Sequence, residues 1–274
     1  MAVILEGGCR VSEMREGAPV VNGTLRVWNR IGRATGAQAI SLRVMEFAPG
    51  LSPAIQNEDC DQILYVERGH SARLSEPSER TPFVTITIDG DPFEIGPSTG
   101  IYIRPNQTFA IDNPGPDSIV MISAQCPDPD RAPRFVELSV ASSDSPRSDQ
   151  PPIVRLADQR AQPTGDRWYR VLVDEKVGSE QVTQFVGSIP PGRAPDHFHQ
   201  YEEVLFILKG VGRMWAGETN TPIGLGSCIY LRKGQVHCVE NTGPGELRLL
   251  GVFYPAGSPS VRYDASEARP RVVS

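Results

Sequence analysis

The chain repeats one β-rich unit, and this repeat limits the possible folds more than any other feature. Residues 96–116 resemble residues 224–244, and the two segments stay aligned without a gap as far as Pro127 and Pro255. Two shorter pairs of segments match upstream: 67–69 with 208–210, and 47–50 with 189–192. The repeat predicts two copies of one structural unit.

Each copy has the pattern of an all-β protein. Short apolar or alternating runs, such as 181–189, 203–208 and 246–254, are bounded by turn residues, and helical periodicity is weak. Glycine and proline number 26 and 25 and are spread along the chain, as expected for many short strands joined by turns. We therefore predict two tandem β-barrels or jelly rolls, because closure of a sheet hides its edges.

The predicted boundaries follow from the repeat and from composition. Residues 1–140 form the first barrel, a Pro/Ser-rich linker covers 141–152, and residues 153–274 form the second barrel. A strand-like segment at 134–140 could cross to the other barrel. The first copy also carries an insertion at 71–94 with a strand at 81–88, and we expect it to cover a barrel mouth or an oligomer interface.

Bulk properties exclude several classes of function. The net charge of −6 and the lack of a basic stripe argue against a nucleic-acid partner. No apolar run reaches the roughly 20 residues needed to cross a membrane, and the opening residues do not resemble a signal peptide. Five cysteines without a CxxC motif favour reduced thiols. We predict a cytoplasmic protein.

Three of the four histidines lie in the second copy, together with a glutamate. His197, His199 and Glu203 fall in one short stretch, and His237 follows on a later strand. Three imidazoles and a carboxylate suit a divalent transition metal, and we predict these four residues as its ligands. Fe, Mn, Ni, Co, Cu and Zn all remain compatible. The fourth histidine, His70, lies outside the cluster, and we expect it on the surface or in a turn.

The spacing of these residues requires a bend in the chain. His197 and His199 lie on the same side of a strand, roughly 6.6 Å apart, and can approach one ion. Glu203 would lie roughly 13 Å from His199 on an extended strand, which is too far for a shared ion. We therefore predict a bend or bulge near Tyr201, with Glu202 as the substitute ligand if the register differs by one. Two simpler interpretations of these four residues are a set of hydrogen-bonded polar core residues and a metal ion with a purely structural role.

The first copy lacks this ligand set. Counting back from the matched glycines places Gln56, Glu58 and Gln62 at the positions of His197, His199 and Glu203, and Phe109 at the position of His237. Two amides, a carboxylate and a phenyl ring make a poor transition-metal site. We predict that only the second barrel holds a metal.

These residues resemble the two sequence motifs of the cupin superfamily. The second copy matches both motifs at Gly192, His197, His199, Glu203, Gly210, Gly226, Gly234, His237 and Asn241. It departs from them by a spacer one residue shorter before His197 and by Arg232 in place of a proline. The resemblance implies a bicupin, in which two small barrels of the double-stranded β-helix type lie in tandem, and a metal ion in the second barrel.

The resemblance leaves the reaction open. Our main hypothesis is a metal-dependent oxygenase similar to quercetin dioxygenase, acting on a small oxygen-rich substrate with dioxygen, with Glu203 as a general base. The alternative is an isomerase, decarboxylase or lyase in which the ion acts as a Lewis acid. A third hypothesis is a metal- or ligand-binding protein without chemistry. A homodimer is compatible with all three.

Overall fold

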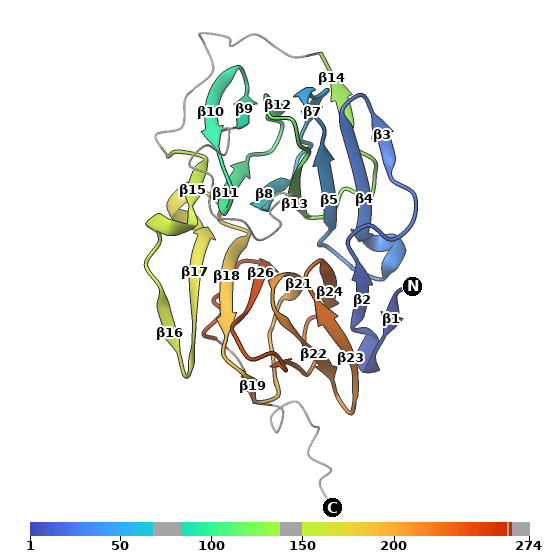
Figure 1. Cartoon of the computed structure of the whole chain (residues 1–274), viewed down its shortest axis with the longest axis vertical. Coiled ribbons are helices and arrows are strands. Elements are labelled where there is room, and N and C mark those ends of the chain that lie inside the picture. The colour runs from blue at the N-terminus through green and yellow to red at the C-terminus, as the bar shows by residue number, and fades with distance from the viewer. Residues whose placement is uncertain (68–83, 138–149, 262, 265–274) are drawn as a thin grey trace, which may run out of the picture.

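The chain folds into two β-barrels that lie one above the other along the long axis of the molecule (Figure 1). The computed structural model describes residues 1–67, 84–137, 150–261 and 263–264. Within these ranges every regular element is a strand or a short 3-10 turn, so the predicted all-β class is confirmed. The 3-10 turns are η1 (Glu6–Gly8), η2 (Arg33–Thr35), η3 (Leu156–Asp158) and η4 (Glu175–Val177).

Two sheets form the second barrel. The larger sheet contains, in spatial order, β1 (Val3–Ile4), β2 (Arg10–Glu13), β24 (Ser227–Leu231), β21 (Glu202–Lys209), β26 (Leu247–Tyr254), β18 (Thr183–Ile189), β17 (Arg167–Val173) and β16 (Gln162–Thr164). The smaller sheet contains β23 (Thr219–Gly224), β22 (Val211–Ala216), β25 (His237–Asn241), β20 (His197–Phe198) and β27 (Tyr263–Asp264), with β19 (Gly192–Arg193) beside β25.

The first barrel has the same plan. Its larger sheet contains β15 (Ile153–Arg155), β11 (Thr99–Ile103), β8 (Asp61–Glu67), β13 (Ile119–Cys126), β5 (Leu42–Phe47), β4 (Leu25–Ile31) and β3 (Val20–Asn22). Its smaller sheet contains β10 (Asp91–Ile95), β9 (Val84–Ile88), β12 (Thr108–Asn113), β7 (Ala54–Gln56) and β14 (Arg134–Val136), with β6 (Gly50–Leu51) beside β12.

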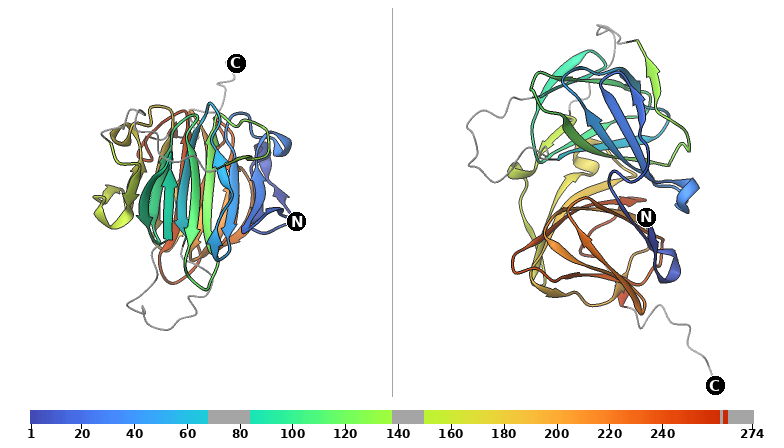
Figure 2. Two further views of the ribbon diagram at one scale, coloured as in Figure 1. Left: turned by 90° about the horizontal axis from the view of Figure 1, so that it is seen from above. Right: turned by 45° about the vertical axis from the view of Figure 1, so that its right-hand side comes forward.

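The two larger sheets pack against each other, which places three apolar cores in one stack (Figure 2). In β8, Leu64 and Val66 point into the first barrel, whereas Ile63 and Tyr65 point into the core shared with the second barrel. Successive side chains of a strand face opposite sides. Both sides of β8 are covered by apolar cores, so every residue of β8 is buried. A strand covered on both faces has a continuous apolar pattern instead of an alternating one.

The barrels exchange strands at their edges. Strand β2, near the N-terminus, pairs with β24 of the second barrel, and β15 pairs with β11 of the first barrel. Sheet membership therefore crosses the predicted boundaries at the N-terminal end of each of the two units, 1–140 and 153–274. The segment expected to cross at 134–140 behaves differently: its described part, β14, pairs with β7 of its own barrel.

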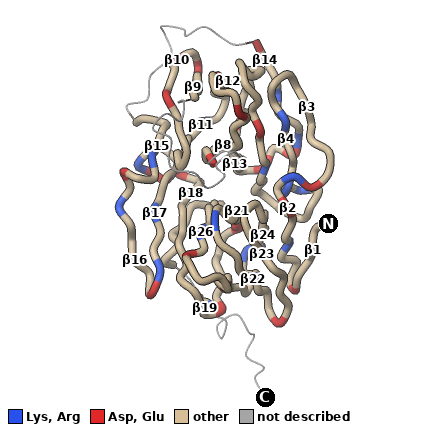
Figure 3. The backbone as a smooth tube through the Cα atoms, viewed as in Figure 1, with Lys and Arg blue, Asp and Glu red and all other residues tan. Residues whose placement is uncertain are grey.

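Several smaller expectations can be compared with the structure. The strand predicted at 81–88 is present as Val84–Ile88 and forms a hairpin with β10, whereas His70 and residues 71–83 lie outside the described residues. All five cysteines are free, in line with the predicted reduced thiols, and all five are buried. No described helix is long and apolar enough to cross a membrane. Acidic and basic residues are interspersed over both barrels (Figure 3).

Candidate metal centre

Three predicted ligands meet inside the second barrel. His197 on β20 lies opposite His237 on β25 in the strand register, and His199 follows directly after β20. One ring nitrogen of each imidazole lies within 4.8 Å of the others. In the described part of the chain this is the single group of three or more His, Cys, Asp or Glu residues close enough to share an ion.

Backbone carbonyl groups orient the three rings. The Nδ1 of His197 lies 3.0 Å from the carbonyl oxygen of Pro195, that of His199 lies 2.9 Å from Val261, and that of His237 lies 2.8 Å from Gln235. A carbonyl oxygen only accepts a hydrogen bond, so each Nδ1 carries the proton and donates it. Each Nε2 therefore keeps its lone pair, as a metal-binding imidazole requires.

Glu203 approaches the three imidazoles from the larger sheet, on the side of His237. The chain bends at Gln200 and Tyr201 between β20 and β21, as the spacing predicted, and Glu203 lies at the start of β21. Its Oε2 is 3.4 Å from the Nε2 of His237. This oxygen is buried and has no hydrogen-bond partner among the described residues. A buried carboxylate oxygen without a donor is costly unless a cation or a proton neutralises it.

Burial determines the protonation of the site. It raises the pKa of Glu203 to about 7 and lowers the pKa of His199 and of His237 to about 4. The two buried imidazoles are therefore neutral at pH 7 and can act as ligands. Three imidazole nitrogens and an unpartnered carboxylate oxygen fit a divalent transition metal.

The substitute ligand Glu202 has a different role. Its carboxylate accepts hydrogen bonds from the backbone N–H groups of Gln38 and Ala39 in the first barrel, at 2.8 and 2.6 Å, and from the Tyr230 hydroxyl. Because strand residues alternate in direction, Glu202 faces the other barrel when Glu203 faces the histidines. Glu202 is therefore an inter-barrel contact.

The histidines line a cavity of about 90 Å³ with mainly apolar walls. Its walls include Trp168, Tyr169, Phe185, Leu205, Val239 and Phe253. The rings of Phe185 and Phe253 lie 4.8 Å apart, and Tyr201 stacks on His199 at 5.0 Å. The cavity therefore combines polar ligands at one end with an apolar surface that can cover the body of a small molecule.

Sequence reasoning found only part of this cavity. On the strands that flank the two motifs, Phe253 lines the cavity, whereas Gln184, Arg213, Trp215 and Tyr230 do not. The strand 181–189 was recognised, and alternation along it would have placed Phe185, Gly187 and Ile189 on one face. Trp168 and Tyr169 had no motif to identify them, and only the fold of β17 beside β18 brings them to the cavity.

In the first barrel, the strand register at β7 differs by one residue from the sequence alignment of the two copies. The strand register places Ile55 opposite Phe109, where His197 lies opposite His237, and Gln56 pairs with Thr108. The prediction that Gln56 occupies the position of His197 is therefore wrong in register, because the connection between β7 and β8 is one residue longer than the one that joins β20 and β21. Phe109 is fully buried and fills the position of His237.

Comparisons with known proteins agree with this fold. Residues 185–253 match the family model described as a cupin domain. The curated relative auxin-binding protein 1 of Arabidopsis thaliana is 31% identical over 86 residues, which cover 28% of this chain and 43% of that protein. The chain thus matches less than half the length of this relative.

Solved structures of oxalate decarboxylase match most of the chain. A structure of oxalate decarboxylase studied for proton-coupled electron transfer has a TM-score of 0.73 at 12% identity, and covers 94% of this chain and 79% of that chain. A deletion mutant of the Bacillus subtilis enzyme has a TM-score of 0.71 at 13% identity, with the same coverage. A Bacillus subtilis structure studied for its Mn(II) centres has a TM-score of 0.72 at 13% identity and the same coverage. At this level of identity the likeness establishes the fold alone.

Proposed function

We propose that this chain, with a bicupin fold and a cupin-domain match over its second barrel, is a metal-dependent enzyme that decarboxylates a small carboxylic acid. The observation that carries the proposal is the group of three imidazoles and Glu203 at one end of an apolar cavity. The metal ligands are His197, His199, Glu203 and His237. The oxalate decarboxylase structures favour this reaction class over the predicted quercetin-dioxygenase-like activity, which has no support among the relatives described above.

The protein's own groups provide the binding site and a proton. A bound divalent cation would supply Lewis-acid polarisation of a substrate oxygen. Loss of CO2 breaks a C–C bond and leaves the electron pair on carbon, which must then receive a proton. Glu203 is the carboxyl group that lines the cavity, so we assign the delivery of this proton to it.

The apolar walls favour a substrate with an apolar or aromatic body. Phe185, Phe253 and Trp168 offer ring surfaces, and the polar ligands lie at one end of the cavity. An acid bound with its carboxylate toward the histidines would place its hydrocarbon part against these rings. The walls would also keep water away from the reacting carbon, so that charges there interact more strongly.

Binding without chemistry is a second candidate function. It is favoured by one observation, the similarity of an 86-residue segment to auxin-binding protein 1, whose name describes a binding protein. The same four ligands and the same apolar walls would then hold a small carboxylate without converting it.

The decisive experiment follows CO2 and dioxygen together. Purified protein loaded with Mn²⁺, Fe²⁺ or Ni²⁺ is incubated with a panel of aliphatic and aromatic carboxylic acids, with and without oxygen. We expect the wild type to release CO2 without stoichiometric oxygen uptake, and we expect His199→Ala to lose this CO2 release. Glu58→Ala, a substitution in the metal-free barrel, is the matched control and keeps the activity. Oxygen uptake in step with turnover would favour the dioxygenase hypothesis instead. Saturable binding without turnover would favour the binding function.

A further inference from the structure

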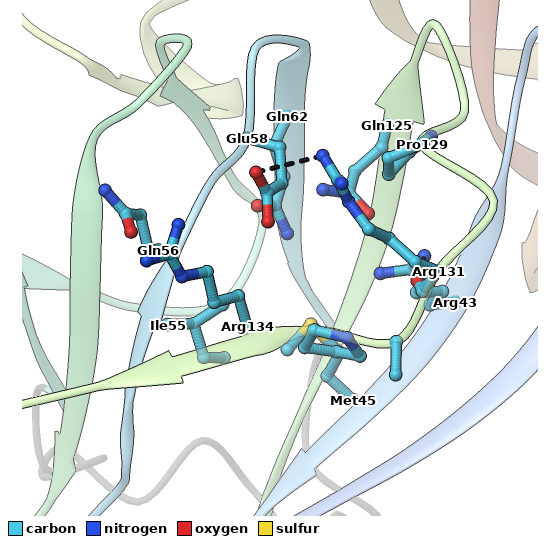
Figure 4. Close-up of a pocket in the computed structure, with 12 residues that line it drawn as sticks. Arg43, Met45, Ile55, Gln56, Glu58, Gln62, Gln125, Pro129, Arg131 and Arg134 are labelled. Atoms are coloured by element: carbon cyan, nitrogen blue, oxygen red, sulfur yellow. Dashed lines mark hydrogen bonds and ion pairs between the residues drawn. The ribbon is translucent and has the colours of Figure 1, made fainter.

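The first barrel contains a pocket of its own (Figure 4). Its lining includes Ile55 and Gln62, which stand at the positions of His197 and Glu203 in the strand registers. Its walls carry three guanidinium groups and several amides, whereas the second cavity is mainly apolar. The lining residues that matter here are Arg43, Arg131, Arg134, Glu58, Gln62 and Gln125. Three cations against one carboxylate leave these walls positively charged.

Two of these residues replace the aromatic pair of the second barrel. Arg43 pairs with Ser123 in the strand register, as Phe185 pairs with Gly251, so Arg43 stands at the position of Phe185. Gln62 pairs with Gln125 in the same way that Glu203 pairs with Phe253. The first barrel therefore has a guanidinium and an amide, Arg43 and Gln125, where the second barrel has the two tilted rings of Phe185 and Phe253.

Arg43 is buried without a carboxylate partner. Arg43 is only 6% exposed, and its Nη2 donates a 2.7 Å hydrogen bond to the carbonyl oxygen of Arg131. Among the described residues, Arg43 forms no ion pair with an Asp or Glu carboxylate. The nearby Asp128 instead accepts the backbone N–H groups of Arg33 and Asp130. Asp128 acts on Arg43 electrostatically but forms no ion pair with it, so an anion bound directly to the guanidinium would stabilise this buried cation.

Two hydrogen-bond acceptors in the same pocket also lack partners. The Oε1 atoms of Gln62 and Gln125 are buried and accept no hydrogen bond from any described residue. Their amide groups are held in place, because Gln62 Nε2 donates to Ser123 at 3.0 Å and Gln125 Nε2 donates to Asn57 at 3.2 Å. The pocket therefore offers a fixed cation for a carboxylate and fixed acceptors for a hydroxyl group.

The rim of the pocket can open at small cost. The free volume is about 10 Å³, enough for about one water molecule, so a larger occupant has to displace a side chain. Figure 4 shows Arg131 and Arg43 on one side, Gln56 and Arg134 on the other, and Glu58 between them. Arg131 is 54% exposed and forms a 2.9 Å ion pair with Glu58. Exposed ion pairs contribute only about 0–1 kcal/mol, so Arg131 can move outward.

We propose that this pocket binds a small hydroxycarboxylate. The carboxylate pairs with the guanidinium of Arg43, which matches it in two parallel hydrogen bonds, and Arg131 closes over it from the rim. The hydroxyl group donates to Gln62 or Gln125. The site needs no metal and is independent of the chemistry proposed for the second barrel.

Arginine side-chain NMR provides a direct test on the full chain. The Nε–H signals of ¹⁵N-labelled protein are followed during titration with sodium glycolate, sodium acetate and, for ionic strength, sodium chloride. Chelator is present throughout, so that carboxylate binding to a metal does not contribute. We expect a saturable shift of the Arg43 signal with glycolate, binding of acetate weaker by about tenfold because one hydrogen bond is lost, and no saturation with chloride.

Variants separate this pocket from the rest of the molecule. Arg43→Lys keeps the charge but loses the two parallel hydrogen bonds, and we expect glycolate affinity to fall by about tenfold or more. Arg155→Lys, at an exposed arginine on β15, and His199→Ala should bind glycolate like the wild type. The proposal is overturned if the wild-type Arg43 signal shows no saturable shift, if only an ordered water occupies the pocket in crystals soaked with glycolate, or if binding is lost in His199→Ala.

Discussion

At the scale of single residues, backbone carbonyl groups prepare the three imidazoles of the second barrel. Each Nδ1 is held by a carbonyl oxygen of the nearby backbone, which fixes both the tautomer and the ring direction. Glu203 is left with a buried oxygen that has no donor among the described residues. The group is therefore arranged for a cation before any cation binds.

We predict that Glu203→Gln weakens metal binding. The substitution keeps the shape of the side chain but removes the negative charge next to His237. We expect the affinity for Mn²⁺ to fall by at least about 10–100-fold, the loss typical of disturbed metal shells, as measured by competition with a chelating dye. Glu240→Gln is the control, because this residue lies on the same strand as His237 but bonds to Trp215 on the outside. Equal affinities of wild type and Glu203→Gln would remove Glu203 from the ligand set.

Glu67 gives a pH-dependent prediction. Burial raises the pKa of its carboxyl group from 4.5 to about 7. Between these values the folded protein binds more protons at this group than the unfolded chain, so stability falls as the pH rises through this range. Glu67→Gln removes this loss and should stabilise the protein by up to about 3 kcal/mol at pH 8, with the gain shrinking to near zero below about pH 4.5.

Urea unfolding at a series of pH values measures this effect. Glu94→Gln, at an exposed glutamate on β10, should show no such pH-dependent difference from the wild type. A stability gain for Glu67→Gln that is independent of pH would contradict the assignment of a raised pKa.

At the scale of elements, the exchanged edge strands join the barrels. Val11 on β2 lies opposite Ile229 on β24 and is buried in the core of the second barrel. In return, β15 continues the sheet of the first barrel beside β11. Each larger sheet therefore has an edge strand that precedes or follows the repeat unit in sequence, which covers an otherwise exposed sheet edge.

We predict that Val11→Asp destabilises the protein although it lies far from the second barrel in sequence. A buried carboxylate without a partner should lower the free energy of unfolding by about 3–5 kcal/mol, measured by urea unfolding followed by tryptophan fluorescence. Val21→Asp, on the exposed edge strand β3, should change it by no more than about 0.5 kcal/mol. Similar small effects of both substitutions would show that β2 does not pack on β24.

At the scale of the whole molecule, the two barrels share a core and reciprocal polar contacts. Tyr102 donates to Asp61 at 2.7 Å in the first barrel, and Tyr230 donates to Glu202 at the matching position of the second barrel. Glu202 also binds backbone N–H groups of the first barrel. The barrels are therefore expected to unfold together.

We predict that Glu202→Ala weakens the contact between the barrels. It leaves the N–H groups of Gln38 and Ala39 and the hydroxyl of Tyr230 without their acceptor, so the free energy of unfolding should fall by about 3 kcal/mol or more. Calorimetry should show a lower unfolding temperature, whereas Glu218→Ala, at an exposed residue, should unfold like the wild type. An unchanged unfolding temperature of Glu202→Ala would contradict this role of the carboxylate.

Local patterns in the sequence were sufficient to predict the architecture and the residues that meet at the centre of the site. The repeat predicts two similar units, turn residues between short apolar runs predict strands, and the spacing of His197, His199 and Glu203 predicts the bend that the structure has at Tyr201. These features depend on residues close in sequence, or on similar segments that are expected to fold alike. They can therefore be interpreted without knowing which strands meet.

Contacts between distant segments were decided only by the tertiary structure. The exchange of β2 and β15, the apolar walls from Trp168 and Phe185, and the buried Arg43 in the first barrel all depend on which sheet edges pair. The one-residue register difference at Ile55 belongs to the same class, since a strand shifted by one residue turns every side chain to the other face. Strand pairing minimises the free energy of the whole molecule, and local propensity does not encode that choice.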